Sequence, residues 1–97
     1  MEKSLLHKLS KDLEISEKRI IEQSIPAFLE TELRNASADI IKIKEQFKVS
    51  TPKELKQKIE LGKIDEHPAW EQLIYWENLN KKMQVVSKWM QNVPITN

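Results

Sequence analysis

Among the residues that could carry chemistry, His67 and Glu71 come closest to a paired metal site. They lie four positions apart and could share one face of a helix as ligands. No third ligand has a suitable spacing, the chain contains no cysteine, and His7 stands alone in a helix where a solvated position is the default. A histidine that caps the start of a helix is therefore the favoured interpretation, and we expect no metal and no cofactor.

Enzymatic chemistry has little support elsewhere in the chain. A catalytic site needs a placed nucleophile, an acid-base pair or a metal, held by turns that tolerate unusual backbone angles. The sequence contains a single glycine, and it has neither a glycine-rich phosphate loop nor a Gly-x-Ser-x-Gly elbow. We expect a protein that is not an enzyme.

The aromatic residues give a stronger signal. All three tryptophans and the only tyrosine fall between positions 70 and 89. Such side chains bury a large area at low entropic cost and carry a hydrogen-bonding tip, so they often anchor protein interfaces. For Tyr75 and Trp76, packing within the core is an equal alternative. For Trp70 and Trp89, an intermolecular role is favoured.

The net charge is only +1, so the chain as a whole has no electrostatic attraction for nucleic acid or for an acidic membrane. The charges are nevertheless unevenly distributed along the sequence. Residues 65–77 contain no Lys or Arg, and residues 81–97 contain no acid. The favoured explanation is a helix whose charges complement its own macrodipole. An alternative is that the acidic run faces a basic partner. The acidic residues are Asp65, Glu66, Glu71 and Glu77.

Four helices can position these side chains. Ser4 can cap a first helix that ends near Glu14, and Ser16 can cap a second that runs from about residue 17 to 47. Pro26 should kink the second helix without breaking it, because apolar periodicity continues in phase across it. Its apolar face carries Ile21, Ile25, Phe28, Leu29, Leu33, Ala36, Ile40, Ile43 and Phe47.

The second half of the chain contains the clearest helix boundaries. Thr51, Pro52 and Glu54 form a capping-box pattern that begins a short third helix, with Leu55, Ile59 and Leu61 on its apolar side. Gly62 can end it in the left-handed conformation. A last helix should run from about 68 to 92 and stop at Pro94. Its main stripe comprises Trp76, Leu79, Met83, Val86, Met90 and Val93, and its second stripe comprises Trp70, Ile74, Val85 and Trp89.

These elements predict one all-α domain over residues 1–97, built as a long antiparallel helical hairpin with short N-terminal and connecting helices. Each long helix carries more apolar arc than one partner can cover, so we expect a homodimer that completes a four-helix arrangement. Residues 1–34 would dimerise and residues 35–97 would bind the partner. Asn80 is either exposed, which is favoured, or a polar residue that sets the register. The expected dimer interface is Ile21, Ile25, Phe28, Leu29 and Leu33.

The segment LLHKLSKDLEISEKRIIEQSIPAFL, residues 5–29, resembles the helical part of ribbon-helix-helix regulators. The shared features are a leucine-spaced helix, a capped turn and an apolar helix that ends in Ala-Phe-Leu. Only Met1–Ser4 precede the first helix, so the DNA-reading strand of that family has no expected counterpart. The resemblance implies dimerising helices.

The rest of the chain resembles the helical tails of small prokaryotic antitoxin-type proteins, through KIKEQFKVS at 42–50, LGKI at 61–64 and HPAWE at 67–71. This resemblance implies a protein that binds and neutralises a cognate toxin through its last helix. Tryptophans would enter apolar grooves while the acids face a basic surface. The expected partner-binding residues are Trp70, Ile74, Trp89, Asp65, Glu66, Glu71 and Glu77.

Two other functions stay open. A dimeric autoregulator could bind DNA through Lys11, Lys18 and Arg19, although acidic neighbours argue against it. A structural subunit of a larger assembly is the other alternative. The sequence shows no signal-like apolar run and no segment near the ~20 apolar residues of a membrane span, so we expect a cytoplasmic protein without membrane contact.

Overall fold

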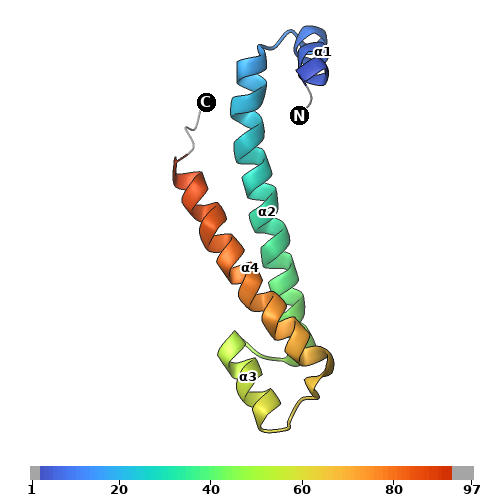
Figure 1. Ribbon diagram of the computed structural model, residues 1–97, viewed down its shortest axis with the longest axis vertical. Helices are drawn as coiled ribbons and strands as arrows, with labels where there is room; N and C mark the ends of the chain where they lie inside the picture. The colour runs from blue at the N-terminus through green and yellow to red at the C-terminus, as the bar shows by residue number, and fades with distance from the viewer. Residues whose placement is uncertain (1–2, 93–97) are drawn as a thin grey trace.

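The computed structural model describes residues 3–92, and this part of the chain consists of helices joined by short turns, with no strand. It contains α1 (Lys3–Leu13), α2 (Glu17–Phe47), α3 (Pro52–Glu60) and α4 (Glu66–Asn92). Helices α2 and α4 form a long antiparallel hairpin, α3 packs at its closed end, and α1 lies at the opposite end of α2 (Figure 1). The predicted all-α hairpin is confirmed.

Local hydrogen bonds explain where α2 and α3 begin. The Ser16 side chain accepts from the Arg19 amide at 3.1 Å, and the Thr51 side chain accepts from the Glu54 amide at 3.1 Å. The Glu54 carboxylate in turn accepts from the Ser50 amide at 2.9 Å, which completes a variant of the capping box. Both predicted caps are confirmed.

Left-handed residues end the helices. Lys48 follows α2 at φ 54°, and Gly62 follows α3 at φ 72°. The Gly62 amide donates to the Ile59 carbonyl at 3.0 Å and the Lys63 amide to the Lys58 carbonyl at 2.9 Å, which is a Schellman motif. The prediction for Gly62 is confirmed.

The start of α1 differs from the sequence-based expectation, and the start of α4 agrees with it. Helix α1 begins at Lys3, so Ser4 lies inside its first turn and does not cap it. The expectation was wrong because capping propensity is only a local preference, and the helix begins two residues earlier than a cap at Ser4 would place it. Helix α4 begins at Glu66, but His67 has an extended backbone, so regular helix starts at Pro68 as expected. Val93 and Pro94 lie outside the described residues.

Pro26 lies inside α2, which continues as one helix from Glu17 to Phe47. Pro26 deprives the Glu22 carbonyl of an amide partner one turn away. The apolar positions on both sides of Pro26 stay in phase, so α2 continues through it. This agrees with the expectation that Pro26 would not break the helix.

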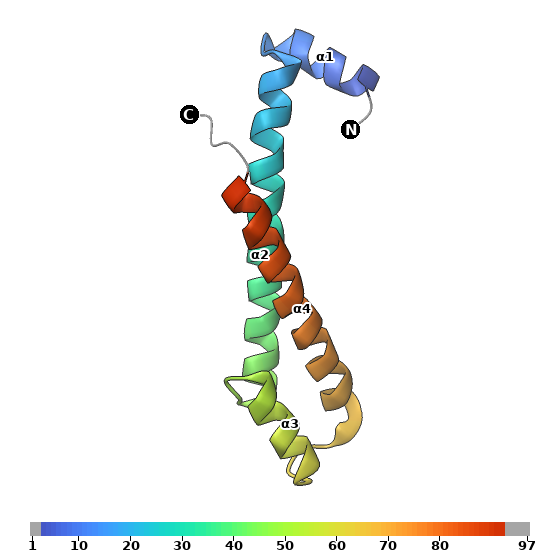
Figure 2. The ribbon, with the colours of Figure 1, turned by 60° about the vertical axis from the view of Figure 1, so that its left-hand side comes forward.

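The core lies at the closed end of the hairpin, where α2, α3 and α4 meet (Figure 2). Leu55 of α3 and Ala69 of α4 have no exposed surface, and Trp76 retains 2%. No polar or charged residue is buried within the described part of the chain. The core consists of Ala36, Ile40, Ile43, Val49, Leu55, Ile59, Ala69, Leu73, Trp76 and Leu79.

The opposite end of the molecule is more open. Helix α1 is anchored to α2 through Leu6 and Ile20, which are both buried. A turn joins the two helices, in which the Ser10 hydroxyl donates to the Ile15 carbonyl at 2.5 Å and Glu14 adopts φ 56°. The result is an elongated chain of 60 × 24 × 18 Å.

Candidate partner-binding surface

Helix α4 presents one side to α2. Trp76, Leu79 and Val86 are buried there, and Met83 and Met90 are half-buried. The predicted main stripe is therefore the core-facing side of α4, apart from Val93, which lies outside the described residues.

The core-facing side of α4 begins earlier in the helix than the predicted main stripe. Ala69 and Leu73 are buried together with Trp76, and they precede it by seven and three positions. This is the helical spacing of a single face, so the signal was present. The sequence-based prediction omitted Ala69 and Leu73 because it took Trp76 as the first residue of the stripe.

The other side of α4 carries an exposed apolar stripe, which we call the outer stripe: Trp70, Ile74, Val85 and Trp89. Their exposed fractions are 44%, 45%, 56% and 62%. Ile74 and Val85 are eleven positions apart, close to three full helical turns, so the two ends of the stripe face the same way. Asn78 and Lys81 separate them. The predicted second stripe therefore lies in solvent in this chain.

Tyr75 and Trp76, for which the sequence left core and interface roles open, have different environments. Trp76 is in the core, whereas Tyr75 is 42% exposed and its hydroxyl donates to the Asp39 carboxylate at 2.5 Å. This hydrogen bond, with lesser contributions from desolvation and from the negative charge of Asp39, raises the pKa of Tyr75 above its ordinary value. Tyr75 therefore bridges α4 to α2.

Lys82 makes a second bridge along the same flank of the hairpin. Its ammonium lies 2.7 Å from the Glu32 carboxylate of α2. The two bridges pair 75 with 39 and 82 with 32, so both fit the same antiparallel register of α2 and α4. Because the Lys82–Glu32 pair is partly exposed, its contribution to stability is small, about 0–1 kcal/mol.

The acidic residues lie around the first turns of α4. Asp65, Glu66, Glu71 and Glu77 are all exposed. The Nδ1 atom of His67 lies 2.7 Å from the Glu71 carboxylate, so these two side chains pair with each other at the surface. Across the described residues, no group of three or more His, Cys, Asp or Glu side chains could hold a metal ion.

The five residues expected at a dimer interface divide into two groups. Leu29 is buried and Leu33 half-buried within this chain. Ile21, Ile25 and Phe28 are 45%, 47% and 62% exposed. The sequence placed all five on one broad arc, and the structure brings only part of that arc against α4.

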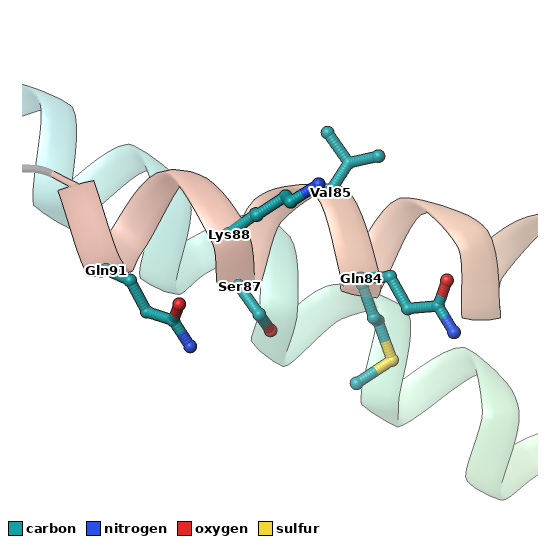
Figure 3. A pocket seen from close by; sticks show the side chains of 6 residues that line it. Gln84, Val85, Ser87, Lys88 and Gln91 are labelled. Atoms are coloured by element: carbon teal, nitrogen blue, oxygen red, sulfur yellow. The ribbon is translucent and has the colours of Figure 1, made fainter.

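One hollow on α4 is a surface depression and not an enclosed cleft. It has a volume of about 550 Å³, and Figure 3 shows the side chains that line it, all from successive turns of α4. A second groove of about 370 Å³ lies between α2 and α4, where half-buried Asn80 lies with Ser37 and Trp76. These linings offer hydroxyl, amide and ammonium groups without a paired acid and base.

The basic residues considered for DNA binding are exposed, but acids accompany them. Lys18 lies 3.9 Å from Glu22 on α2, and Glu17 approaches His7 of α1 at 3.8 Å. Lys11 and Arg19 are exposed nearby. Opposite charges therefore alternate over this part of the surface.

The fold and its surface define a small helical-hairpin protein with an apolar core at one end and an exposed aromatic stripe on its last helix. The chain belongs to the uncharacterized protein MJ0235 family, whose model matches residues 1–97. Neither a curated protein nor a solved structure matches the chain. Within residues 3–92, the helices are too short or too polar to cross a membrane.

Proposed function

We propose that this protein is a non-enzymatic binding module that docks on a separate protein through the outer stripe of α4. The observation that carries the proposal is the exposure of two tryptophans, Trp70 and Trp89, on the side of α4 opposite the core. Tryptophan is enriched among the residues that dominate interface energies, and large apolar side chains left in water favour a partner.

The geometry of α4 suits a helix-in-groove mode of recognition. The outer stripe runs along five turns of a helix whose other side is held rigidly by Trp76 and Leu79. A preformed helix loses little conformational entropy on binding. The partner would supply a long apolar groove with pockets for the two indole rings.

The charge at the Trp70 end of the outer stripe favours a basic surface on the partner. Asp65, Glu66, Glu71 and Glu77 are exposed beside the Trp70 end of the stripe. Complementary charge across an interface steers association and fixes orientation more than it adds affinity. A toxin with a basic RNA-binding cleft has this chemistry, so the proposed action is antitoxin-like, with the helix blocking that cleft sterically. The resemblance of residues 42–50, 61–64 and 67–71 to antitoxin tails supports this mode.

The test is co-expression with the product of the adjacent gene. Wild-type protein should co-purify with that product and rescue growth if the product is toxic. The Trp70→Ala, Trp89→Ala double variant should lose both properties, because it removes the two anchors without touching the core. Circular dichroism should show unchanged helicity.

A matched control removes two other exposed apolar side chains. Ile41 of α2 and Leu61 after α3 are 53% and 69% exposed and lie outside the outer stripe. An Ile41→Ala, Leu61→Ala variant should co-purify and rescue like the wild type. Full binding and rescue by the double tryptophan variant would refute a role for the outer stripe.

A further inference from the structure

The end of the molecule away from α3 leaves a large apolar surface without cover. On α2 the exposed residues are Ile21, Ile25 and Phe28, spaced four and three positions apart as in helices that pack lengthwise. Helix α1 adds exposed leucines at positions 5, 9 and 13, at 56%, 37% and 55%. We call these six residues the open-end surface. It shares no residue with the outer stripe of α4.

The whole chain exposes more surface than a compact protein of its size. Its accessible area is 7665 Å² for a mass of 11.5 kDa. A compact monomer of that mass exposes about 5,800 Å², so the excess is roughly 1,900 Å². The radius of gyration of 19.3 Å likewise exceeds the value of about 13 Å for a compact domain of this length.

This excess is more than a stable interface requires. A standard protein interface buries about 800 Å² on each partner. Covering the open-end surface would bury six apolar side chains that carry no charge, which matches the apolar core of homodimer interfaces. The excess area of the elongated chain as a whole is therefore large enough to include one dimer contact.

Helix α1 is weakly attached to the rest of the chain. Helix α1 has 11 residues, and Leu6 is its one buried side chain among residues 4–13. Isolated helices shorter than ~12–15 residues are marginal in water, so α1 depends on tertiary contacts. Burial of its exposed leucines against another chain would therefore stabilise α1. A second copy is always present at the chain's own concentration.

We propose that the open-end surface is the contact with a second copy of this chain. Two copies of α2 would pack lengthwise across a twofold axis, each through Ile21, Ile25 and Phe28, and the exposed leucines of α1 would close over the contact. A twofold contact uses the same surface on both copies, so one apolar surface is sufficient. The inference goes beyond the proposed partner binding and does not depend on it.

The test measures mass by size-exclusion chromatography with light scattering at tens of micromolar. Wild-type protein should elute at twice the chain mass of 11.5 kDa. An Ile25→Asp, Phe28→Asp variant should elute as a monomer, because two charges would be forced into an apolar contact. Both positions are exposed in the single chain, so helices α2–α4 should stay folded and the circular dichroism spectrum of the variant should remain helical.

Ile41→Asp provides the matched control. Ile41 is on the same helix and is 53% exposed, but it lies at the α3 end, outside the open-end surface. This variant should remain a dimer, and so should the Trp70→Ala, Trp89→Ala variant. A monomeric wild type, or an Ile25→Asp, Phe28→Asp variant that stays dimeric, would overturn the proposal.

A second measurement uses the wild type alone. Hydrogen exchange at the α1 amides should become faster by at least tenfold when the protein is diluted below the dimer's dissociation constant, while α3 amides change little. Exchange rates in α1 that do not depend on concentration would also overturn the proposal.

Discussion

The two ends of the hairpin are built from the same two helices, yet they bury very different fractions of their apolar residues. At the α3 end, Ile43, Leu55 and Trp76 retain 2%, 0% and 2% exposure. At the α1 end, Ile25 and Phe28 retain 47% and 62%. The difference comes from a third element, because α3 packs on α4 and adds Leu55 and Ile59 to the core that α2 and α4 share, whereas α1 contacts α2 at the other end.

This comparison shows that an amphipathic helix specifies a buried face only where another element covers it. Phe28 is larger than Leu29 and its neighbour in sequence, but Leu29 is buried and Phe28 is not. The core at the closed end holds most of the buried side chains of the described residues. The uncovered residues at the other end and on α4 remain free for binding.

The largest expected difference between buried and exposed sites is in stability. Trp76→Ala should destabilise the protein by about 3–5 kcal/mol, because it leaves a cavity in the core. Trp89→Ala removes the same side chain from a position that is 62% exposed and should stay within about 0.5 kcal/mol of the wild type. Urea unfolding followed by circular dichroism measures both. Equal losses would mean that the outer stripe is part of the stabilising core.

Hydrogen exchange should separate the two ends directly. Amides in α3 and in the facing segments of α2 and α4, around Ile43 and Leu73, should exchange only by global unfolding, since they lie in the packed core. Amides of α1 should exchange by local opening in the single chain, because Leu6 and Ile20 are its main buried contact. Mass spectrometry of peptides from each end measures the protection. Uniform protection would contradict the contrast between the ends.

A smaller effect is expected from the cap that attaches α3 to the closed end. Thr51→Ala removes the acceptor for the Glu54 amide and should cost about 1 kcal/mol. Thr31→Ala is the matched control, because Thr31 lies on the exposed surface in the middle of α2 and donates to the Ala27 carbonyl. Alanine is a better helix former there, so the control should not destabilise the protein. A loss in the control as large as that of Thr51→Ala would remove the capping explanation.

The smallest effect concerns the Tyr75–Asp39 bridge between the ends. The folded pKa of Tyr75 is raised above its ordinary value of about 10, so folding favours the protonated hydroxyl. The bridge should stabilise the protein fully below that unfolded value and lose its effect as the pH rises through the folded pKa. Tyr75→Phe should therefore be less stable than wild type at pH 7, and the gap should close at alkaline pH. Urea midpoints between pH 7 and 11 measure the gap, and a gap that does not change with pH would contradict this assignment.

The sequence by itself determined the four helices and the start of α2 and both ends of α3. The caps at Ser16 and Thr51 and the left-handed Gly62 depend on hydrogen bonds within a few residues, so local chemistry is enough to place them. The spacing of apolar residues was enough to predict the α2–α4 hairpin. It also separated the outer stripe from the core-facing stripe, because helical geometry assigns each position to a side.

Only the tertiary structure decided which parts of the broad apolar arcs are covered. Leu29 and Phe28 lie on one wide arc in the sequence, and the side of α2 that α4 covers determines which of them is buried. Tyr75 and Trp76 were equal candidates for the core, and only the position of α2 placed Asp39 within reach of the Tyr75 hydroxyl. Burial depends on where a second helix lies, and neither propensity nor periodicity within one helix contains that information.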